Sequence, residues 1–400
     1  LPTFVSHGSD DKIVHVEHSR RIVAALKELG YTVEYDEVPG KGHTWGPSGR
    51  PWWGNECMDR PMISNFFHKY RRRRYPRKVH YKTNILRFNG AYWVEIDEMD
   101  EIYRSARITA EVHEGNVVQV KSENITRYTL SLAGGLGIDM DKPLTVISNG
   151  FKARIEHIPM SGKVTLRAIR NGKGEDAGYI FLLNPEEAEK VDEVEVWARL
   201  SEEGMTEMLY NQIGGKGLKK KPSLFGPIID AFNNPFILIW GTRGDGADVE
   251  ANKKAAYGVA TWWRAYANGE CIVKADTEVT VRDIMRYNLV LFGDPETNIL
   301  IEKIKDELPI KFEEGSIHLG SQKFTDNLSL VMIYPNPLNT ERYILLNAST
   351  TAKGMGNFKM LYNGWMTLPD YAIFNGTVVE EGLKGYLAAG FFDKNWQLPR

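Results

Sequence analysis

The sequence predicts a multidomain α/β protein, and three stretches of the chain carry this prediction. Residues 1–72 alternate strand, helix and strand patterns, residues 77–170 hold a series of short alternating strands, and residues 227–400 alternate strands with helices. Strand–helix alternation is typical of parallel sheets covered by helices, whereas short strands separated by turn residues are typical of a β-sandwich. Residues 171–226 show no regular pattern and are expected to be an irregular connector.

Length and composition exclude several classes of protein. A chain of 400 residues exceeds one ordinary hydrophobic core, and 42% hydrophobic with 26% charged residues is a globular composition. The 50 basic and 52 acidic residues give a net charge of −2, so no overall field favours nucleic acid or an anionic membrane. No apolar run approaches the ~20 residues of a membrane span. Two cysteines, Cys57 and Cys271, have neither disulfide-framework nor metal-ligand spacing.

The first seventy residues predict a strand–helix–strand unit. An apolar strand at residues 2–6 is followed by the acidic loop HGSDD, and a helical pattern runs from Glu17 to Leu29, just before Gly30. Residues 31–38 alternate as a second strand, and the loop PGKGH follows at 39–43. Because the carboxyl ends of parallel strands meet at one edge of a sheet, an acid and a histidine are expected to meet there.

Both loops resemble part of a known family. Segments HGSDDKIV (7–14) and GKGH (40–43) resemble the C-terminal end of α/β-hydrolase domains, in particular the prolyl-oligopeptidase-like and dienelactone-hydrolase-like branches. The resemblance implies that residues 1–72 are the C-terminal portion of an α/β-hydrolase sheet, with Asp11 as triad acid and His43 as triad base. Asp10 is an alternative acid. The competing interpretation is that Asp11 and His43 are ordinary loop residues of a degenerate domain.

The same resemblance implies a missing partner segment. In this family the triad order is serine, acid, histidine, and the chain contains no Gly-x-Ser-x-Gly pattern. The nucleophilic serine is therefore expected upstream of Leu1, on an N-terminal hydrolase segment. A chain that opens within an expected strand predicts a fragment or a processed product. An ester or peptide substrate is expected, with no cofactor and no metal, and a secreted or periplasmic location is favoured over a cytoplasmic one.

Aromatic residues follow the histidine loop. Trp45 and Trp52, together with Trp53, are expected either to line a substrate cleft beside His43 or to pack a helix near residues 58–70 onto the sheet. The four arginines at 71–74 are interpreted as a solvated linker between domains, because the rest of the chain has no basic surplus.

The β-rich segment, residues 77–170, is expected to be sandwich-like. Its aromatic residues Tyr92, Trp93 and Tyr103 suggest either a carbohydrate-binding surface or part of the core, and the core is the favoured interpretation. In the connector, the glycine- and lysine-rich residues 214–222 are interpreted as a mobile linker.

The last segment, residues 227–400, is expected to be a doubly wound, Rossmann-like α/β domain. Strands are predicted at 235–241, 271–274 and 288–293, with helices at 247–267, 280–286 and 297–306. The loop at 241–246 lacks the Gly-x-Gly-x-x-Gly pattern, which disfavours a dinucleotide site. The loop at 293–298 is interpreted as a turn and helix cap, or as a polar rim at the carboxyl edge of the sheet.

This region also resembles the C-terminal extension of large bacterial prolyl-oligopeptidase-like hydrolases, through segments such as NPFI (234–237), NLVLFG (288–293) and IYPNPL (333–338). That resemblance implies no catalytic residues in the extension. The leading hypothesis is therefore the C-terminal portion of a multidomain serine hydrolase. The alternatives are a non-catalytic binding or assembly protein that retains a hydrolase relic, and a carbohydrate-binding accessory protein.

Overall fold

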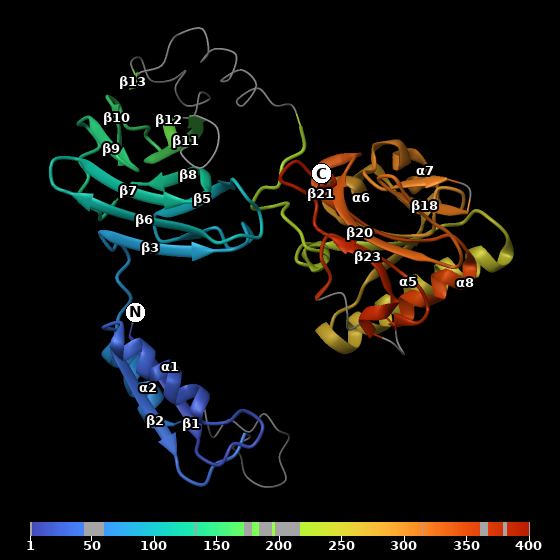
Figure 1. Ribbon diagram of the computed structural model, residues 1–400, viewed down its shortest axis with the longest axis horizontal. Helices are drawn as coiled ribbons and strands as arrows, with labels where there is room; N and C mark the ends of the chain where they lie inside the picture. Colours follow the sequence, from blue (N-terminus) through green and yellow to red (C-terminus); the bar gives the residue numbers. More distant parts are fainter. Residues whose placement is uncertain are drawn as a thin grey trace. The chain divides into compact units, whose positions relative to one another are not determined.

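The computed structural model divides the chain into two compact units, Leu1–Pro76 and Arg77–Arg400, and each is described by itself. The structure describes residues 2–43, 60–132, 134–171, 178–183, 194–196, 217–313, 315–360, 367–378 and 382–399. Figure 1 labels their helices and strands.

Unit Leu1–Pro76 has the strand–helix–strand order that the sequence predicts. Strands β1 (Thr3–Gly8) and β2 (Val33–Val38) pair in parallel, and α1 (Glu17–Glu28) connects them. Gly30 follows α1 with a positive φ of 77°, a conformation that glycine adopts without strain. Helix α2 (Pro61–Lys69) buries Phe66, whose ring centroid lies 5.5 Å from that of Phe4. This aromatic contact packs α2 against the sheet.

The first part of unit Arg77–Arg400 contains two antiparallel-rich sheets that enclose one core (Figure 1). Buried residues alternate along the strands, as along β6, because successive side chains point to opposite faces. One sheet has the order β13-β10-β9-β7-β6-β3 and the other β12-β11-β8-β5-β4. The strands are β3 (Lys78–Thr83), β4 (Gly90–Ala91), β5 (Val94–Met99), β6 (Ala106–His113), β7 (Val117–Glu123), β8 (Ile125–Ser131), β9 (Leu144–Ser148), β10 (Phe151–Ile155) and β11 (Lys163–Asn171).

Two further strands correct the expectation that residues 171–226 are wholly irregular. Strand β12 (Gly178–Leu183) pairs with β11, and β13 (Val194–Val196) pairs with β10. The segment GYIFLL (178–183) is a continuous apolar run, so it lacks the alternation of apolar and polar residues that identifies a strand from sequence. The hydrogen-bond partners of β12 are supplied by the edge of β11, and that edge exists only in the folded sheet.

The second part of this unit contains a seven-stranded sheet of order β15-β14-β16-β21-β20-β22-β23. The predicted strand–helix alternation is present, and the first four strands in this order are parallel. The strands are β14 (Phe236–Trp240), β15 (Ile272–Ala275), β16 (Asn288–Phe292), β20 (Ser329–Asn336), β21 (Asn339–Ser349), β22 (Tyr371–Phe374) and β23 (Tyr386–Gly390).

The sheet is mixed rather than wholly parallel, which corrects the expectation of a purely parallel, doubly wound sheet. Strands β20 and β21 form an antiparallel hairpin whose tight connection lies between Asn336 and Asn339, and β22 and β23 continue antiparallel beyond β20. A connection this short cannot hold the crossover helix that a parallel pair requires. The apolar pattern of the sequence also predicts strands at 327–333 and 342–347, which correspond to β20 and β21, but it does not give their relative direction.

Helices and short strands complete the unit. Helix α5 (Gly246–Ala267) is the longest, and its N-cap Asp245 accepts hydrogen bonds from the backbone N–H groups of Ala247 and Asp248. No helix within the described ranges is both long and apolar enough to span a membrane. The remaining elements are α6 (Val281–Arg286), α7 (Ile299–Ile304), β17 (Lys311–Glu313), β18 (Ser316–Leu319), β19 (Gln322–Phe324) and α8 (Ala352–Met355), with 3-10 turns η2 (Ile228–Phe232), η3 (Asp276–Glu278), η4 (Lys305–Glu307), η5 (Gly356–Met360) and η7 (Gly382–Gly385).

A buried ion pair lies within unit Arg77–Arg400. Lys220 Nζ is 2.5 Å from Asp370 Oδ2, and both side chains are fully buried. Tyr103, in the loop after β5, donates a hydrogen bond to Asp370 Oδ1 at 2.9 Å. Burial lowers the pKa of Lys220 and raises the pKa of Asp370, because both charged forms lose water. Lys220 was expected in a mobile linker, and its burial in this pair corrects that interpretation.

Candidate active site

The two loops singled out in the sequence meet at the carboxyl ends of β1 and β2. The backbone N–H of Asp10 donates to the carbonyl of Lys41 at 3.0 Å, and the N–H of Ser9 donates to the carbonyl of Val38 at 3.0 Å. A Cβ on Gly8 would overlap the carbonyl oxygen of Lys41. Glycine is therefore required at position 8 for the acidic loop to approach the histidine loop.

Asp11 and His43 are in direct contact. His43 Nδ1 lies 2.9 Å from Asp11 Oδ2, although 32 positions separate the residues in sequence. Asp11 Oδ1 accepts hydrogen bonds from the backbone N–H groups of Ile13 and Val14, both at 2.9 Å. The Asp11 side chain is 5% exposed and the His43 side chain 43% exposed. The carboxylate is thus held rigidly beneath an imidazole whose Nε2 forms no hydrogen bond with any described residue.

The surroundings of Asp11 favour its charged form. Burial acts to raise the pKa of Asp11, but the hydrogen bonds from Val14, His43 and Ile13 outweigh it and lower the pKa from 3.8 to about 2. A carboxylate that is ionised at neutral pH fixes the proton of His43 on Nδ1 and leaves Nε2 free to accept a proton. The pair therefore has the form of a positioned general base.

His7 also lies beside Asp11, which the sequence analysis did not anticipate. His7 Nε2 lies 3.2 Å from Asp11 Oδ2 and 2.9 Å from the carbonyl oxygen of Val14. Because a carbonyl oxygen only accepts, Nε2 carries a proton, and Nδ1 lies within hydrogen-bond distance of Ser19 Oγ, at 2.6 Å. In the sequence, this contact is indicated only by the short separation of four residues between His7, at the end of β1, and Asp11 in the loop that follows.

The other candidate residues fall elsewhere. Asp10 is exposed and its Oδ1 accepts a hydrogen bond from Ser9, so the structure places Asp11 and not Asp10 against His43. Trp45, Trp52 and Trp53 lie outside the described residues. Trp93 is only 3% exposed and belongs to the core between the two antiparallel-rich sheets, so it offers no surface for carbohydrate.

No group of three or more His, Cys, Asp or Glu side chains suited to a metal ion occurs among the residues the structure describes. The chemistry available at Asp11 and His43 themselves is proton transfer and charge stabilisation.

A pH titration is expected to report the Asp11–His43 contact. Since the folded pKa of Asp11 lies below its ordinary 3.8, ionisation of Asp11 favours the folded state above about pH 4, and this contribution is lost as the pH falls toward 2. The side-chain carboxyl ¹³C resonance of Asp11 should titrate with a midpoint of about 2. In His43→Ala the midpoint should rise but stay below 3.8, because the two backbone hydrogen bonds remain. A midpoint at or above 3.8 in the unsubstituted protein would contradict the geometry.

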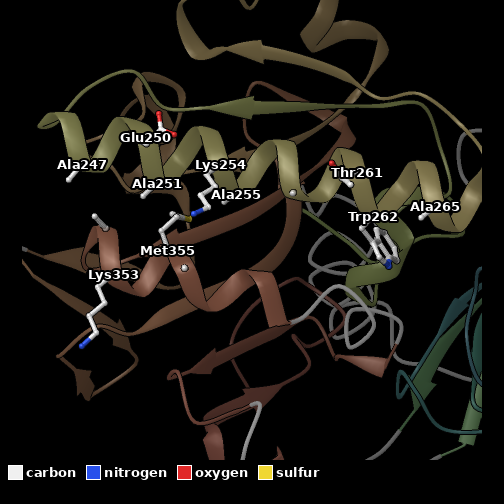
Figure 2. Close-up of a pocket in the computed structure, with 13 residues that line it drawn as sticks. Ala247, Glu250, Ala251, Lys254, Ala255, Thr261, Trp262, Ala265, Lys353 and Met355 are labelled. Atoms are coloured by element: carbon white, nitrogen blue, oxygen red, sulfur yellow. The ribbon is translucent and has the colours of Figure 1, made fainter.

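A cavity lies in unit Arg77–Arg400, between α5 and α8. It has a volume of about 890 Å³, and Figure 2 shows alanines together with the larger Lys254 and Trp262 on the α5 side and Met355 on the α8 side. Among the described lining residues there is no Ser, Cys or His, so the cavity is not assigned to hydrolytic chemistry. The lining residues are Ala247, Glu250, Ala251, Lys254, Ala255, Gly258, Thr261, Trp262, Ala265, Ala352, Lys353, Met355 and Gly356.

No protein-family model matches this chain, and no curated protein matches it. The hydrolase resemblance therefore depends on the two loop motifs and on the geometry of the residues within them.

Proposed function

We propose that this chain is the C-terminal portion of a serine hydrolase, in which Asp11 and His43 are the acid and base of a catalytic triad. The observation that carries the proposal is the 2.9 Å contact between Asp11 Oδ2 and His43 Nδ1 at the carboxyl edge of a parallel strand pair. The nucleophilic serine belongs to a segment outside these 400 residues. The substrate is a carboxylic ester or a peptide.

The proposed mechanism assigns a role to each atom of the pair. His43 Nε2 accepts the proton of the serine hydroxyl as its oxygen attacks the substrate carbonyl, and it then protonates the leaving alcohol or amine. Asp11 keeps the other imidazole proton on Nδ1 and stabilises the imidazolium that forms. Water then attacks the acyl-enzyme with the same two proton transfers through His43. This step releases the carboxylic acid and regenerates the serine.

The exposed surfaces of unit Leu1–Pro76 support a missing segment. Within the described residues, β1 and β2 form a sheet of only two strands, and a two-stranded sheet is marginally stable on its own. Parallel strands are normally covered on both faces, yet the residues of β2 are only partly buried. On the helix, Ile22 is 56% exposed, and Leu29 just after α1 is 72% exposed. A further strand beside this pair and apolar surface packed against α1 would complete the unit and bring the serine to His43.

The test is covalent labelling of the native protein, together with any segment that accompanies it, by a fluorophosphonate probe. Intact mass should show one probe adduct on a serine outside these 400 residues. His43→Ala should reduce the labelling rate by at least about 10³-fold, because the serine loses its base. The matched control is His18→Ala, since His18 is exposed in α1, and it should leave labelling unchanged. Absence of labelling when the accompanying segment is present would contradict the proposal.

The second candidate is a non-catalytic binding or assembly protein that retains a hydrolase relic. The contact between His7 Nε2 and Asp11 Oδ2 at 3.2 Å favours it, because Asp11 then serves to lock the acidic loop whether or not catalysis occurs. The sequence of the accompanying segment separates the two candidates. A Gly-x-Ser-x-Gly elbow supports the hydrolase, and glycine or alanine at the nucleophile position supports the relic.

A further inference from the structure

The cavity between α5 and α8 follows one face of α5. Its lining on this helix begins at Ala247 and ends at Ala265. Positions 247, 251, 254, 258, 261 and 265 are separated by alternating steps of four and three residues, which places them on one side of the helix. Because a helix rises by about 1.5 Å per residue, these positions span roughly 27 Å. The cavity is therefore an elongated groove.

Small residues leave room for a ligand in this groove. On α5 these residues are Ala247, Ala251, Ala255, Gly258 and Ala265, and Ala352 and Gly356 belong to the opposite wall. The volume of about 890 Å³ lies within the ~300–1,000 Å³ range of small-molecule sites. Spread over roughly 27 Å, this volume leaves a mean cross-section of about 33 Å², whereas an α-helix is about 10–12 Å across. The groove therefore fits a thin, linear ligand better than a helix of a partner protein.

The lining offers few partners for hydrogen bonds. Beyond the first turn of α5, the backbone N–H groups are bonded within the helix. The polar side chains of the lining are Thr261, Trp262 and the three charged residues Glu250, Lys254 and Lys353. A sugar or a peptide in this groove would therefore bury polar groups that lack partners, which weakens binding. An aliphatic chain has no such groups and is stabilised when the alanine face removes it from water.

Lys254 supplies a positive charge within the groove. Figure 2 shows Lys254 and Met355 extending toward one another from the two walls. In the same view Lys353 extends away from α5, and Glu250 extends away from α8. The lining holds two lysines and one glutamate, a net charge of +1, and neither lysine forms an ion pair with any residue the structure describes. An ammonium group beside an apolar groove suits an anionic head group at the end of an aliphatic chain.

We propose that this groove binds a free long-chain carboxylate, that is, a fatty-acid anion. The carboxylate accepts a charge-assisted hydrogen bond from Lys254 Nζ. The chain lies along the alanine face of α5, where Met355 and Trp262 add apolar contacts. The chain thus supplies most of the affinity, and Lys254 distinguishes an anionic head group from a cationic one. The site is independent of the proposed hydrolytic chemistry, because it shares no residue with the Asp11–His43 pair.

The test is calorimetric titration of the full chain with octanoate, decanoate and dodecanoate, each kept below its micelle-forming concentration. Each carboxylate should bind saturably, with a single molecule per chain. Because the free energy of burying a chain grows with every CH₂ group, the Kd should fall by about tenfold for every two carbons added. Decylammonium carries a chain of similar length with the opposite charge, and it should bind more weakly than decanoate.

Two substitutions with opposite expected effects test the position of the head group. Lys254→Gln removes the cation, so it should weaken decanoate binding by about threefold to tenfold. Glu250→Gln removes a carboxylate one helical turn before Lys254 that repels an anionic head group, so it should tighten decanoate binding by about twofold to threefold. Both side chains are exposed on α5, so neither substitution disturbs the core.

The matched control is Lys253→Gln. Lys253 adjoins Lys254 but lies outside the cavity lining, with its Nζ 5.3 Å from the ring centre of Trp240, so the substitution should leave decanoate binding unchanged. Failure of all three carboxylates to bind would overturn the proposal, and so would tighter binding of decylammonium than of decanoate. Decanoate binding that survives Lys254→Gln at full strength, or binding to anionic phospholipid vesicles without binding of the free carboxylates, would overturn it as well.

Discussion

Under the proposed triad mechanism, replacing Asp11 with asparagine is expected to lower kcat of ester hydrolysis by about 10⁴-fold, measured on the chain together with its proposed serine-bearing segment. Asparagine retains an oxygen for the N–H groups of Ile13 and Val14, so the acidic loop keeps its shape. Its amide group, however, donates to His43 Nδ1 where the carboxylate accepted. The imidazole proton then moves to Nε2, which can no longer take the proton of the serine. Steady-state kinetics with an activated ester such as p-nitrophenyl acetate measures the effect.

Asp10→Asn provides the matched control for this prediction. It is the same substitution one residue earlier, on an exposed side chain whose Oδ1 is bound by Ser9. Its kcat should stay within about twofold of the unsubstituted enzyme, as expected for a surface position away from the reacting atoms. If Asp10→Asn lowered kcat as much as Asp11→Asn, the assignment of Asp11 as the triad acid would be wrong.

The second large effect is expected at the buried ion pair of unit Arg77–Arg400. Lys220→Met should lower the free energy of unfolding by roughly 3–5 kcal/mol, because it leaves Asp370 buried without its counter-charge. Besides Asp370, Lys220 Nζ donates to the carbonyl of Phe225 at 2.8 Å and lies 4.3 Å from the ring centre of Trp396. Chemical denaturation followed by tryptophan fluorescence would measure the loss.

Two further variants test the cause of this loss. Lys221→Met removes the neighbouring lysine, whose partner Glu341 is 69% exposed, and should change the free energy of unfolding by at most ~1 kcal/mol. The double variant Lys220→Met with Asp370→Leu removes both charges and should regain much of the stability, since a buried pair is often replaceable by apolar side chains. A double variant less stable than Lys220→Met alone would show that packing and the hydrogen bonds that Asp370 accepts from Tyr103 and from the N–H of Phe392 outweigh the uncompensated charge.

The strand–helix–strand order of residues 3–38 and the strands β14, β15 and β16 could be predicted from the sequence, because their apolar periods and glycine positions are local properties. The acidic and histidine loops could also be predicted to meet, because each follows one of two parallel strands and parallel strands place their carboxyl ends together. Strands β12 and β13 could not be predicted in this way. Their pairing depends on the edges of β11 and β10, which no local pattern describes.

The tertiary structure alone decided which groups lie side by side over long sequence separations. It placed Asp11, the acid that the loop resemblance had already favoured over Asp10, against His43, because the contact depends on the direction of each side chain in a tight loop. It also brought Lys220 to Asp370, 150 positions away, although lysine in a glycine-rich stretch is typical of a solvated linker. Local sequence determines the element that a residue joins, whereas burial, charge pairing and cavities depend on how the elements pack.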